Sequence, residues 1–127
     1  MAVVGKLVIS ERLGQSQVSR QLKVTVRNMS LTGAVEIVFD AADEEFANRL
    51  LHQLEPLSKT EEAEVFSLDS QGKWSVYIIG SRFGDYKVRS SKSPELSADS
   101  AKRIIQALKR RFLHGISEVD LEEYALV

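Results

Sequence analysis

Hydrophobic residues in this chain change their spacing twice, from alternation with polar residues to the spacing of an amphipathic helix. In residues 21–28 and 31–40 every second side chain is apolar, as in strands that bury one face. Residues 6–13 predict a further strand before them, which ends at Gly14. The residues that follow at helical spacing are Phe46, Leu50, Leu54 and Leu57, with Ala47 and Leu51 beside them. The chain must therefore combine strands with helices.

The second half of the chain follows the same order. Residues 63–68 and 73–80 predict two strands around a hairpin turn at residues 69–72, where Gly72 supplies a positive φ. Residues 85–91 predict a third strand. A second amphipathic helix comes after it, and its apolar face consists of Ala101, Ile104, Ile105, Leu108 and Phe112.

Polar residues indicate where the two helices begin and end. Asp40 or Asp43 can cap the first helix, because a carboxylate accepts hydrogen bonds from the free amides of a first turn. The second helix is expected to begin at Ser93 or at Ser97. Gly115 is expected to end it as the residue just after the helix.

These elements predict an α+β domain with the order βββα–βββα. We expect a mostly antiparallel sheet of about six strands with both helices packed on one face. Residues 1–127 are interpreted as one domain, because a chain of this length buries a substantial core without disulfides. The domain consists of two halves of similar order, about 1–58 and 59–115, and an acidic C-terminal tail, 116–127.

Composition argues against several kinds of chemistry. The chain has no cysteine, which excludes disulfides, thiolate metal sites and a cysteine nucleophile. His52 and His114 do not belong to a metal-ligand spacing, and the sequence contains neither a P-loop nor a Gly-x-Ser-x-Gly motif. We therefore assign no catalytic, cofactor-binding or metal-binding residue, and we expect a protein that is not an enzyme and uses no cofactor.

The length of the apolar segments predicts where the protein is located. No segment approaches the run of about 18 apolar residues that a membrane-spanning helix needs. The opening apolar segment is short and is interrupted by Lys6, which argues against a signal peptide. We expect a cytoplasmic protein without a membrane partner.

Charge is unevenly distributed, although the net charge is only −1. Acidic residues dominate residues 36–69, basic residues dominate residues 82–111, and the tail contains acids and no base. Such a distribution concerns partners more than fold. The solvent side of the second helix is basic and carries Lys102, Arg103, Lys109 and Arg110.

This basic helix face has two interpretations. It can contact the phosphates of a nucleic acid or an acidic partner. It can also be a solvated face without a ligand, because the helix dipole stabilises Lys and Arg near a C-terminus by about 0.3–1 kcal/mol each.

The acidic tail also has two interpretations. As a regulatory segment it folds back and screens the basic helix face. As a structural segment it forms a short helix or an added strand that packs Leu121 and Tyr124 on the domain. The acids of the tail are Glu118, Asp120, Glu122 and Glu123.

The predicted sheet carries a second set of basic residues. Basic side chains around an aromatic residue on a sheet suit the stacking of single-stranded nucleic acid. The residues expected on this face are Lys23, Thr25, Arg27, Lys87 and Arg89, with Tyr77 among them.

An arginine and an aromatic residue meet at an expected hairpin tip. Phe83 beside Arg82 is either an exposed contact for a partner or a side chain that folds back over the sheet edge. The candidate partner-binding residues of the chain are Arg82, Phe83, Lys87, Arg89, Lys102, Arg103, Lys109 and Arg110.

The sequence favours a non-catalytic binding or assembly module that engages a protein partner. A homodimer through a sheet edge or an uncovered sheet face is one form of such an assembly. The alternative is a nucleic-acid-binding protein that uses the basic helix or the basic sheet face. A small enzyme or a ligand-binding domain ranks third.

Overall fold

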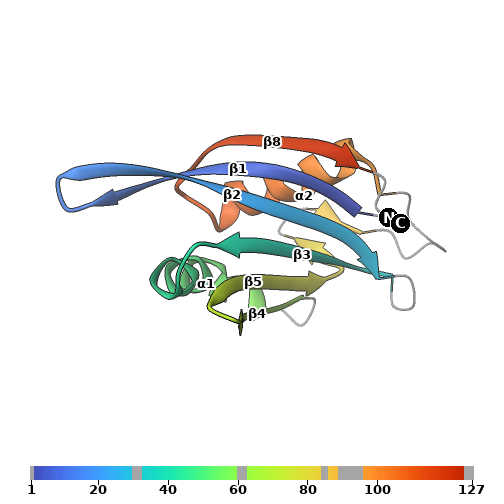
Figure 1. The fold of residues 1–127 in the computed structure, drawn as a ribbon. Helices are drawn as coiled ribbons and strands as arrows, with labels where there is room; N and C mark the ends of the chain where they lie inside the picture. The colour runs from blue at the N-terminus through green and yellow to red at the C-terminus, as the bar shows by residue number, and fades with distance from the viewer. Residues whose placement is uncertain (1, 30–32, 60–62, 84–85, 89–95, 125–127) are drawn as a thin grey trace.

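The computed structural model describes residues 2–29, 33–59, 63–83, 86–88 and 96–124 (Figure 1). Six strands form one antiparallel sheet in the order β4-β5-β3-β2-β1-β8. The strands of this sheet are β1 Ala2–Leu13, β2 Ser16–Met29, β3 Ala34–Ala41, β4 Ala63–Ser70, β5 Lys73–Gly80 and β8 Ile116–Tyr124. Two helices and a separate two-stranded ribbon accompany it, namely α1 Glu44–Ser58, α2 Ala98–Arg111, β6 Arg82–Phe83 and β7 Tyr86–Lys87.

The predicted α+β class, the antiparallel sheet of six strands and the order βββα–βββα are confirmed. The third strand of the second half is short, and as β7 it pairs with β6 outside the sheet. The sixth place in the sheet belongs to β8, which pairs with β1 along one edge. Residues 116–124 of the acidic tail are therefore an added strand and not a helix.

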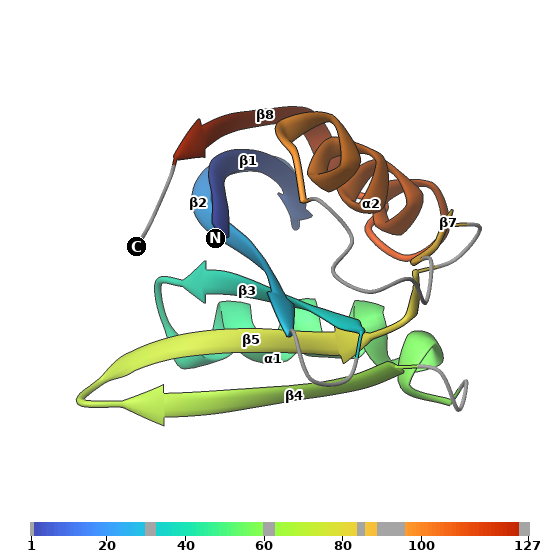
Figure 2. The same ribbon diagram turned by 90° about the vertical axis from the view of Figure 1, so that its right-hand side faces the viewer.

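Both helices pack on the same face of the sheet, here called the inner face (Figure 1). Alternation along β2 buries Leu22, Val24 and Val26 under the helices and turns the residues between them outward, as the sequence predicts. Figure 2 shows α1 beside β5 and β4, and α2 at the opposite end of the sheet beside β8. One continuous core joins the two helices, and it includes Leu54 of α1 and Ile105 of α2.

The helix caps are local side-chain interactions. Asp43 caps α1, and its Oδ1 accepts a hydrogen bond of 2.8 Å from the backbone N–H of Phe46. Ser97 caps α2 in a reciprocal arrangement with Ser100, in which each hydroxyl accepts a hydrogen bond from the other residue's backbone N–H. Of the alternatives in the sequence, the structure therefore selects Asp43 and Ser97. The hairpin turn after β4 is also as predicted, with Gly72 at φ 78°.

The predicted role of Gly115 as the residue that ends α2 is wrong. The helix ends at Arg111 with Phe112 as its cap, and Gly115 does not have a positive φ. Its carbonyl accepts a hydrogen bond of 2.7 Å from the N–H of Ser10 in β1. A Cβ at this position would lie 2.5 Å from the Ser10 carbonyl oxygen, so close approach to β1 requires glycine here.

The β1–β2 hairpin projects beyond the rest of the sheet (Figure 1). Pairing of β1 with β8 stops at Ile9, and pairing of β2 with β3 starts at Val24. Residues 10–13 and 16–19 therefore have strand partners only in each other. Glu11 of this projecting part accepts two hydrogen bonds from Arg49 of α1, at 2.7 Å from Nε and 2.9 Å from Nη2. This bidentate pair joins the hairpin to the helix.

Arg20 completes the connection between the hairpin and α1. Its guanidinium carbon lies 5.0 Å from the centre of the Phe46 ring, and that of Arg49 lies 5.6 Å from the same centre. The hydrogen bonds from Arg49 lower the pKa of Glu11, while the hydrogen bond from the Phe46 amide lowers the pKa of Asp43. Sequence reasoning missed the contacts of Glu11 and Arg20 with α1, because these residues are far from the helix in the chain.

Candidate functional site

The face of the sheet opposite the helices, here called the outer face, carries a largely apolar row that crosses five strands. Directly opposed residues of neighbouring strands form this row, and such residues share one face of an antiparallel sheet. Each of them is half-buried, although neither helix covers this face. The outer-face row consists of Phe66 of β4, Tyr77 of β5, Val38 of β3, Thr25 of β2 and Val4 of β1.

Aromatic and aliphatic side chains concentrate at the β4 end of the row. The rings of Phe66 and Tyr77 are stacked, with centroids 5.1 Å apart and planes within 3° of parallel. Leu68 lies two residues further along β4 and is 52% exposed. In the described part of the chain, the other exposed large hydrophobic residue is Leu13 at the tip of the β1–β2 hairpin, at 42%. The outer face therefore offers apolar surface to a partner.

Charges of both signs surround the outer-face row. Arg27 of β2 faces Glu36 of β3, with its Nε 3.7 Å from Glu36 Oε1. Lys6 of β1 stands opposite Lys23 of β2 on one side and Asp120 of β8 on the other. Because acids and bases are interleaved, this face is not a basic platform.

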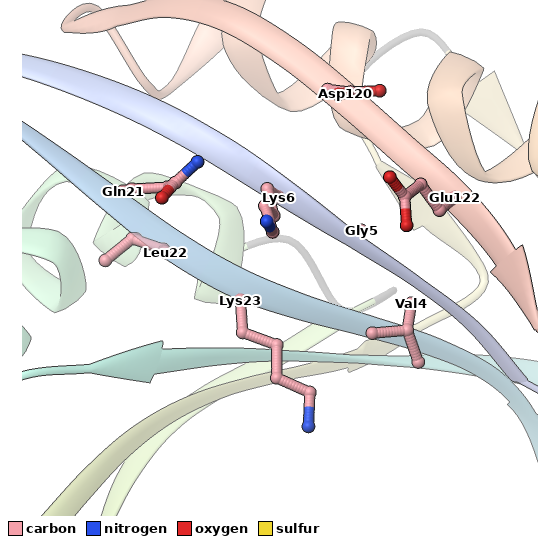
Figure 3. Close-up of a pocket in the computed structure, with 8 residues that line it drawn as sticks. All are labelled: Val4, Gly5, Lys6, Gln21, Leu22, Lys23, Asp120 and Glu122. Atoms are coloured by element: carbon pink, nitrogen blue, oxygen red, sulfur yellow. The ribbon is translucent and has the colours of Figure 1, made fainter.

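A hollow of about 320 Å³ lies on the outer face over β1, between β2 and β8. Figure 3 shows Lys6 at its middle, with Gln21 on the β2 side and Glu122 on the β8 side. Two lysines and two carboxylates line it, which suits a surface or peptide that carries both charges better than a polyanion. The lining residues are Val4, Gly5, Lys6, Gln21, Leu22, Lys23, Asp120 and Glu122.

No family model, curated protein or solved structure matches this chain. Within the residues that the structure describes, neither helix is long and apolar enough to cross a membrane. Across the same residues, no three His, Asp or Glu side chains gather closely enough to hold a metal ion. What the chain binds must be inferred from its own side chains.

The basic face of α2 points away from the outer face, because α2 packs on the inner face. Arg103 and Arg110 are exposed, and Lys102 and Lys109 are half-buried. None of the four forms an ion pair with another described residue. The two surfaces are therefore separate, and their cations do not combine into one patch.

The β6–β7 ribbon holds three of the candidate residues. Arg82 and Lys87 are exposed and stand opposite each other in the ribbon. Of the two interpretations of Phe83, the exposed contact is wrong, because this side chain is 0% exposed and belongs to the core. The expectation that Lys87 shares the sheet face with Lys23 is also wrong, because the ribbon is not part of the six-stranded sheet. Arg89 lies outside the described residues.

Three acids of the tail do not screen the basic face of α2. Glu118, Asp120 and Glu122 stand opposite outward-facing residues of β1, so the ladder directs their side chains to the outer face. For these three acids the screening hypothesis is wrong. Leu121 alternates with them and is buried against the domain, as the structural interpretation predicts. The side chains of Glu123 and Tyr124 lie outside the described part.

A second hollow, of about 370 Å³, lies between α1 and β4 beside His52. His52 Nδ1 is 3.5 Å from Glu55 Oε2, and the side chains of both residues are largely exposed. The hydroxyl of Ser58, which also lines the hollow, donates to the backbone carbonyl of Glu55 at 2.7 Å. This serine is thus bonded to the helix backbone and is not activated by the histidine.

Sequence reasoning missed most of the outer-face row. The sequence predicts that Thr25 and Tyr77 face outward, but it does not assign Phe66, Val38 and Val4 to any surface. A signal for them exists, because each is an apolar residue out of phase with the buried residues of its own strand. Their alignment into one row depends on the register between strands, which a single strand does not encode.

Proposed function

We propose that this chain is a non-catalytic assembly module whose outer face binds a protein partner, and that this partner is a second copy of the chain. The observation that carries the proposal is the outer-face row, a half-exposed and largely apolar line of side chains on the sheet face opposite the helices. Burial of such apolar surface against a partner stabilises the complex, because it removes the surface from water.

The dimensions of the outer face suit a protein interface. Six strands spaced by about 4.8 Å span about 24 Å, and a strand of eight residues is about 26 Å long. The product is a flat area of about 600 Å², to which the uneven side-chain surface adds. This is close to the roughly 800 Å² that each partner contributes to a standard interface.

Two features favour pairing of faces over pairing of edges. The edge strand β4 presents Glu64 and Asp69, and the edge strand β8 presents Glu118 and Asp120, all of them exposed. Identical acidic edges repel one another and discourage addition of strand to strand. A two-fold axis that lies in the plane between two outer faces would instead bring the apolar row of one copy onto that of the other.

The test is the molar mass of the protein in solution, measured by light scattering over a wide concentration range. The wild-type protein is expected to form a dimer that Leu68→Glu dissociates, because the substitution places a charge in the apolar contact. Leu13→Glu is the matched control, since it makes the same change at an exposed leucine of the hairpin tip. A monomer at every concentration, or equal effects of the two substitutions, overturns the proposal.

Nucleic-acid binding is the second candidate, and the basic face of α2 favours it. Four cations without ion pairs to described residues are available there for phosphates. Four phosphate contacts predict a loss of affinity of about 50- to 150-fold between about 50 and 200 mM salt. The double substitution Lys109→Glu, Arg110→Glu is expected to abolish this binding. Absence of oligonucleotide binding at low salt would eliminate the candidate.

A further inference from the structure

A hollow of about 180 Å³ lies where α2 passes the β6–β7 ribbon, here called the α2–β7 hollow. Arg103, Gln106 and Arg110 of α2 line it from one side, and Tyr86 of β7 lines it from the other. The three helix residues are spaced by three and four positions, so they share one face over an axial distance of about 10 Å. Two elements distant in sequence therefore build one small concave surface.

Each of the four described side chains that line the α2–β7 hollow can donate hydrogen bonds. The guanidinium groups of Arg103 and Arg110 donate only, whereas the Gln106 amide and the Tyr86 hydroxyl can both donate and accept. Among the described residues that line the hollow there is no carboxylate. Neither arginine forms an ion pair or side-chain hydrogen bond with another described residue, so both guanidinium groups are available to a ligand.

From this arrangement we infer that the α2–β7 hollow binds a phosphate monoester. Two guanidinium groups match the charge of a monoester, about −1.5 to −2 at neutral pH, whereas a carboxylate or a phosphodiester has a single negative charge. A hollow of about 180 Å³ accommodates a phosphate group and the first atoms attached to it. A complete dinucleotide or a drug-sized ligand would need a larger cavity.

The helix dipole does not assist this site. Arg103 and Arg110 lie in the middle and last turns of α2, and the dipole disfavours an anion near a helix C-terminus. The attraction for a phosphate must therefore come from the lining side chains. Substitution of the arginines should consequently remove binding and not merely weaken it by a small factor.

The first experiment is an NMR titration of the ¹⁵N-labelled protein with phenyl phosphate, a monoester of suitable size. Amide shifts are expected to centre on Tyr86 and on residues 103–110. Affinity should increase by up to about tenfold between pH 5.0 and pH 7.5, because the second phosphate ionisation lies near pH 6. Sulfate is the control ligand, since it keeps its double charge over this range and reports any titration of the protein itself. Absence of shifts at these residues overturns the inference.

Substitutions test the assigned donors directly. Arg103→Gln with Arg110→Gln is expected to weaken phenyl phosphate binding at least tenfold, and Tyr86→Phe to weaken it a few-fold while the ring is kept. The control pair is Arg12→Gln with Lys73→Gln, which removes two exposed cations that do not line the hollow. Both arginines of the hollow are exposed, so the variant should unfold at the temperature of the wild type. Equal loss in the control pair, or unchanged binding in the arginine variant, overturns the inference.

A third experiment distinguishes binding of a phosphate monoester from binding of a nucleic-acid backbone. Dimethyl phosphate and an oligonucleotide without terminal phosphates present phosphodiesters to the same residues. Weaker binding of dimethyl phosphate than of phenyl phosphate is expected from the charge match. Preferential binding of dimethyl phosphate or of the oligonucleotide at the α2–β7 hollow would replace the inference with the nucleic-acid interpretation. The outer face points away from this hollow, so failure of the proposed dimer leaves the result unaffected.

Discussion

Replacing Glu11 with Gln tests whether the Glu11–Arg49 pair holds the projecting hairpin on α1. The Glu11 side chain is 10% exposed, and that of Arg49 is 34% exposed. A sheltered charge-assisted hydrogen bond contributes about 1.5–3 kcal/mol, whereas an exposed ion pair contributes about 0.2–1 kcal/mol. Because Glu11 is largely buried and Arg49 is a third exposed, we expect the substitution to lower the free energy of unfolding by about 1.5–2 kcal/mol.

This loss corresponds to a measurable change in melting temperature. Unfolding entropy is about 2.1 cal/mol/K per residue, which for 127 residues is about 270 cal/mol/K. Each kcal/mol of lost stability therefore lowers Tm by about 4 °C, and Glu11→Gln should lower it by about 6–7 °C. Thermal unfolding followed by circular dichroism at pH 7 measures the shift.

The same pair predicts a pH dependence. Hydrogen bonds from Arg49 hold the pKa of Glu11 below its ordinary value of 4.5. A carboxylate whose pKa is lower in the folded state stabilises the fold above the unfolded pKa, and this contribution is lost as the pH falls through the folded pKa. The difference in stability between wild type and Glu11→Gln should therefore be complete at pH 6–7 and should decrease below about pH 4.5.

A control substitution separates this effect from general loss of charge. Glu64→Gln makes the same change at an exposed residue of β4 that has no ion pair with a described residue. The Tm of Glu64→Gln is expected to lie within about 2 °C of the wild-type Tm at both pH 3 and pH 7. An equal cost of Glu11→Gln at pH 3 and pH 7, or a cost that does not exceed that of Glu64→Gln, would refute the reasoning.

Three further substitutions test the packing and capping of the fold by chemical denaturation. Gly5→Ala should cost about 2–3 kcal/mol and reduce amide protection in β8, because a Cβ at Gly5 would overlap Leu121; full stability would contradict the close approach of β8 to β1. Phe83→Ala should lower the free energy of unfolding by about 3–5 kcal/mol, because the ring is fully buried. A loss below about 1 kcal/mol would show that the Phe83 side chain is exposed. Ser97→Ala should cost about 1 kcal/mol through loss of the α2 cap, with the uncapping confirmed by faster amide exchange at Ser100.

Features that depend on neighbouring residues could be predicted from the sequence. The alternation in β2 identified the buried face correctly, because side chains of a strand alternate between its two sides whatever the strand pairs with. The spacing of Phe46, Leu50 and Leu54 identified the buried face of α1 for the equivalent reason. Helix caps such as Asp43 and Ser97 act within one turn, so the candidate caps included the correct ones.

Features that depend on distant segments could not be predicted in this way. Residues 85–91 have the pattern of a strand, but the sixth place in the sheet belongs to β8, which pairs with β1 and packs Leu121 against Gly5. The burial of Phe83 follows from the position of its ribbon over the core, and local sequence is compatible with either outcome. The candidate basic residues were identified individually, while the hollow that joins Arg103 and Arg110 with Tyr86 required the placement of β7.

By itself, the sequence determined the class of the fold, the buried face of most elements and the separation of acidic from basic segments, since each of these follows from the identity and spacing of nearby residues. Only the tertiary structure decided which surfaces those residues form together. Strand register aligned the outer-face row, and chain packing brought Arg49 to Glu11 and Tyr86 to α2. The physical reason is that these contacts join residues far apart in the chain. The periodicity of a segment reports which of its own residues share a face, but not which distant segment packs on that face.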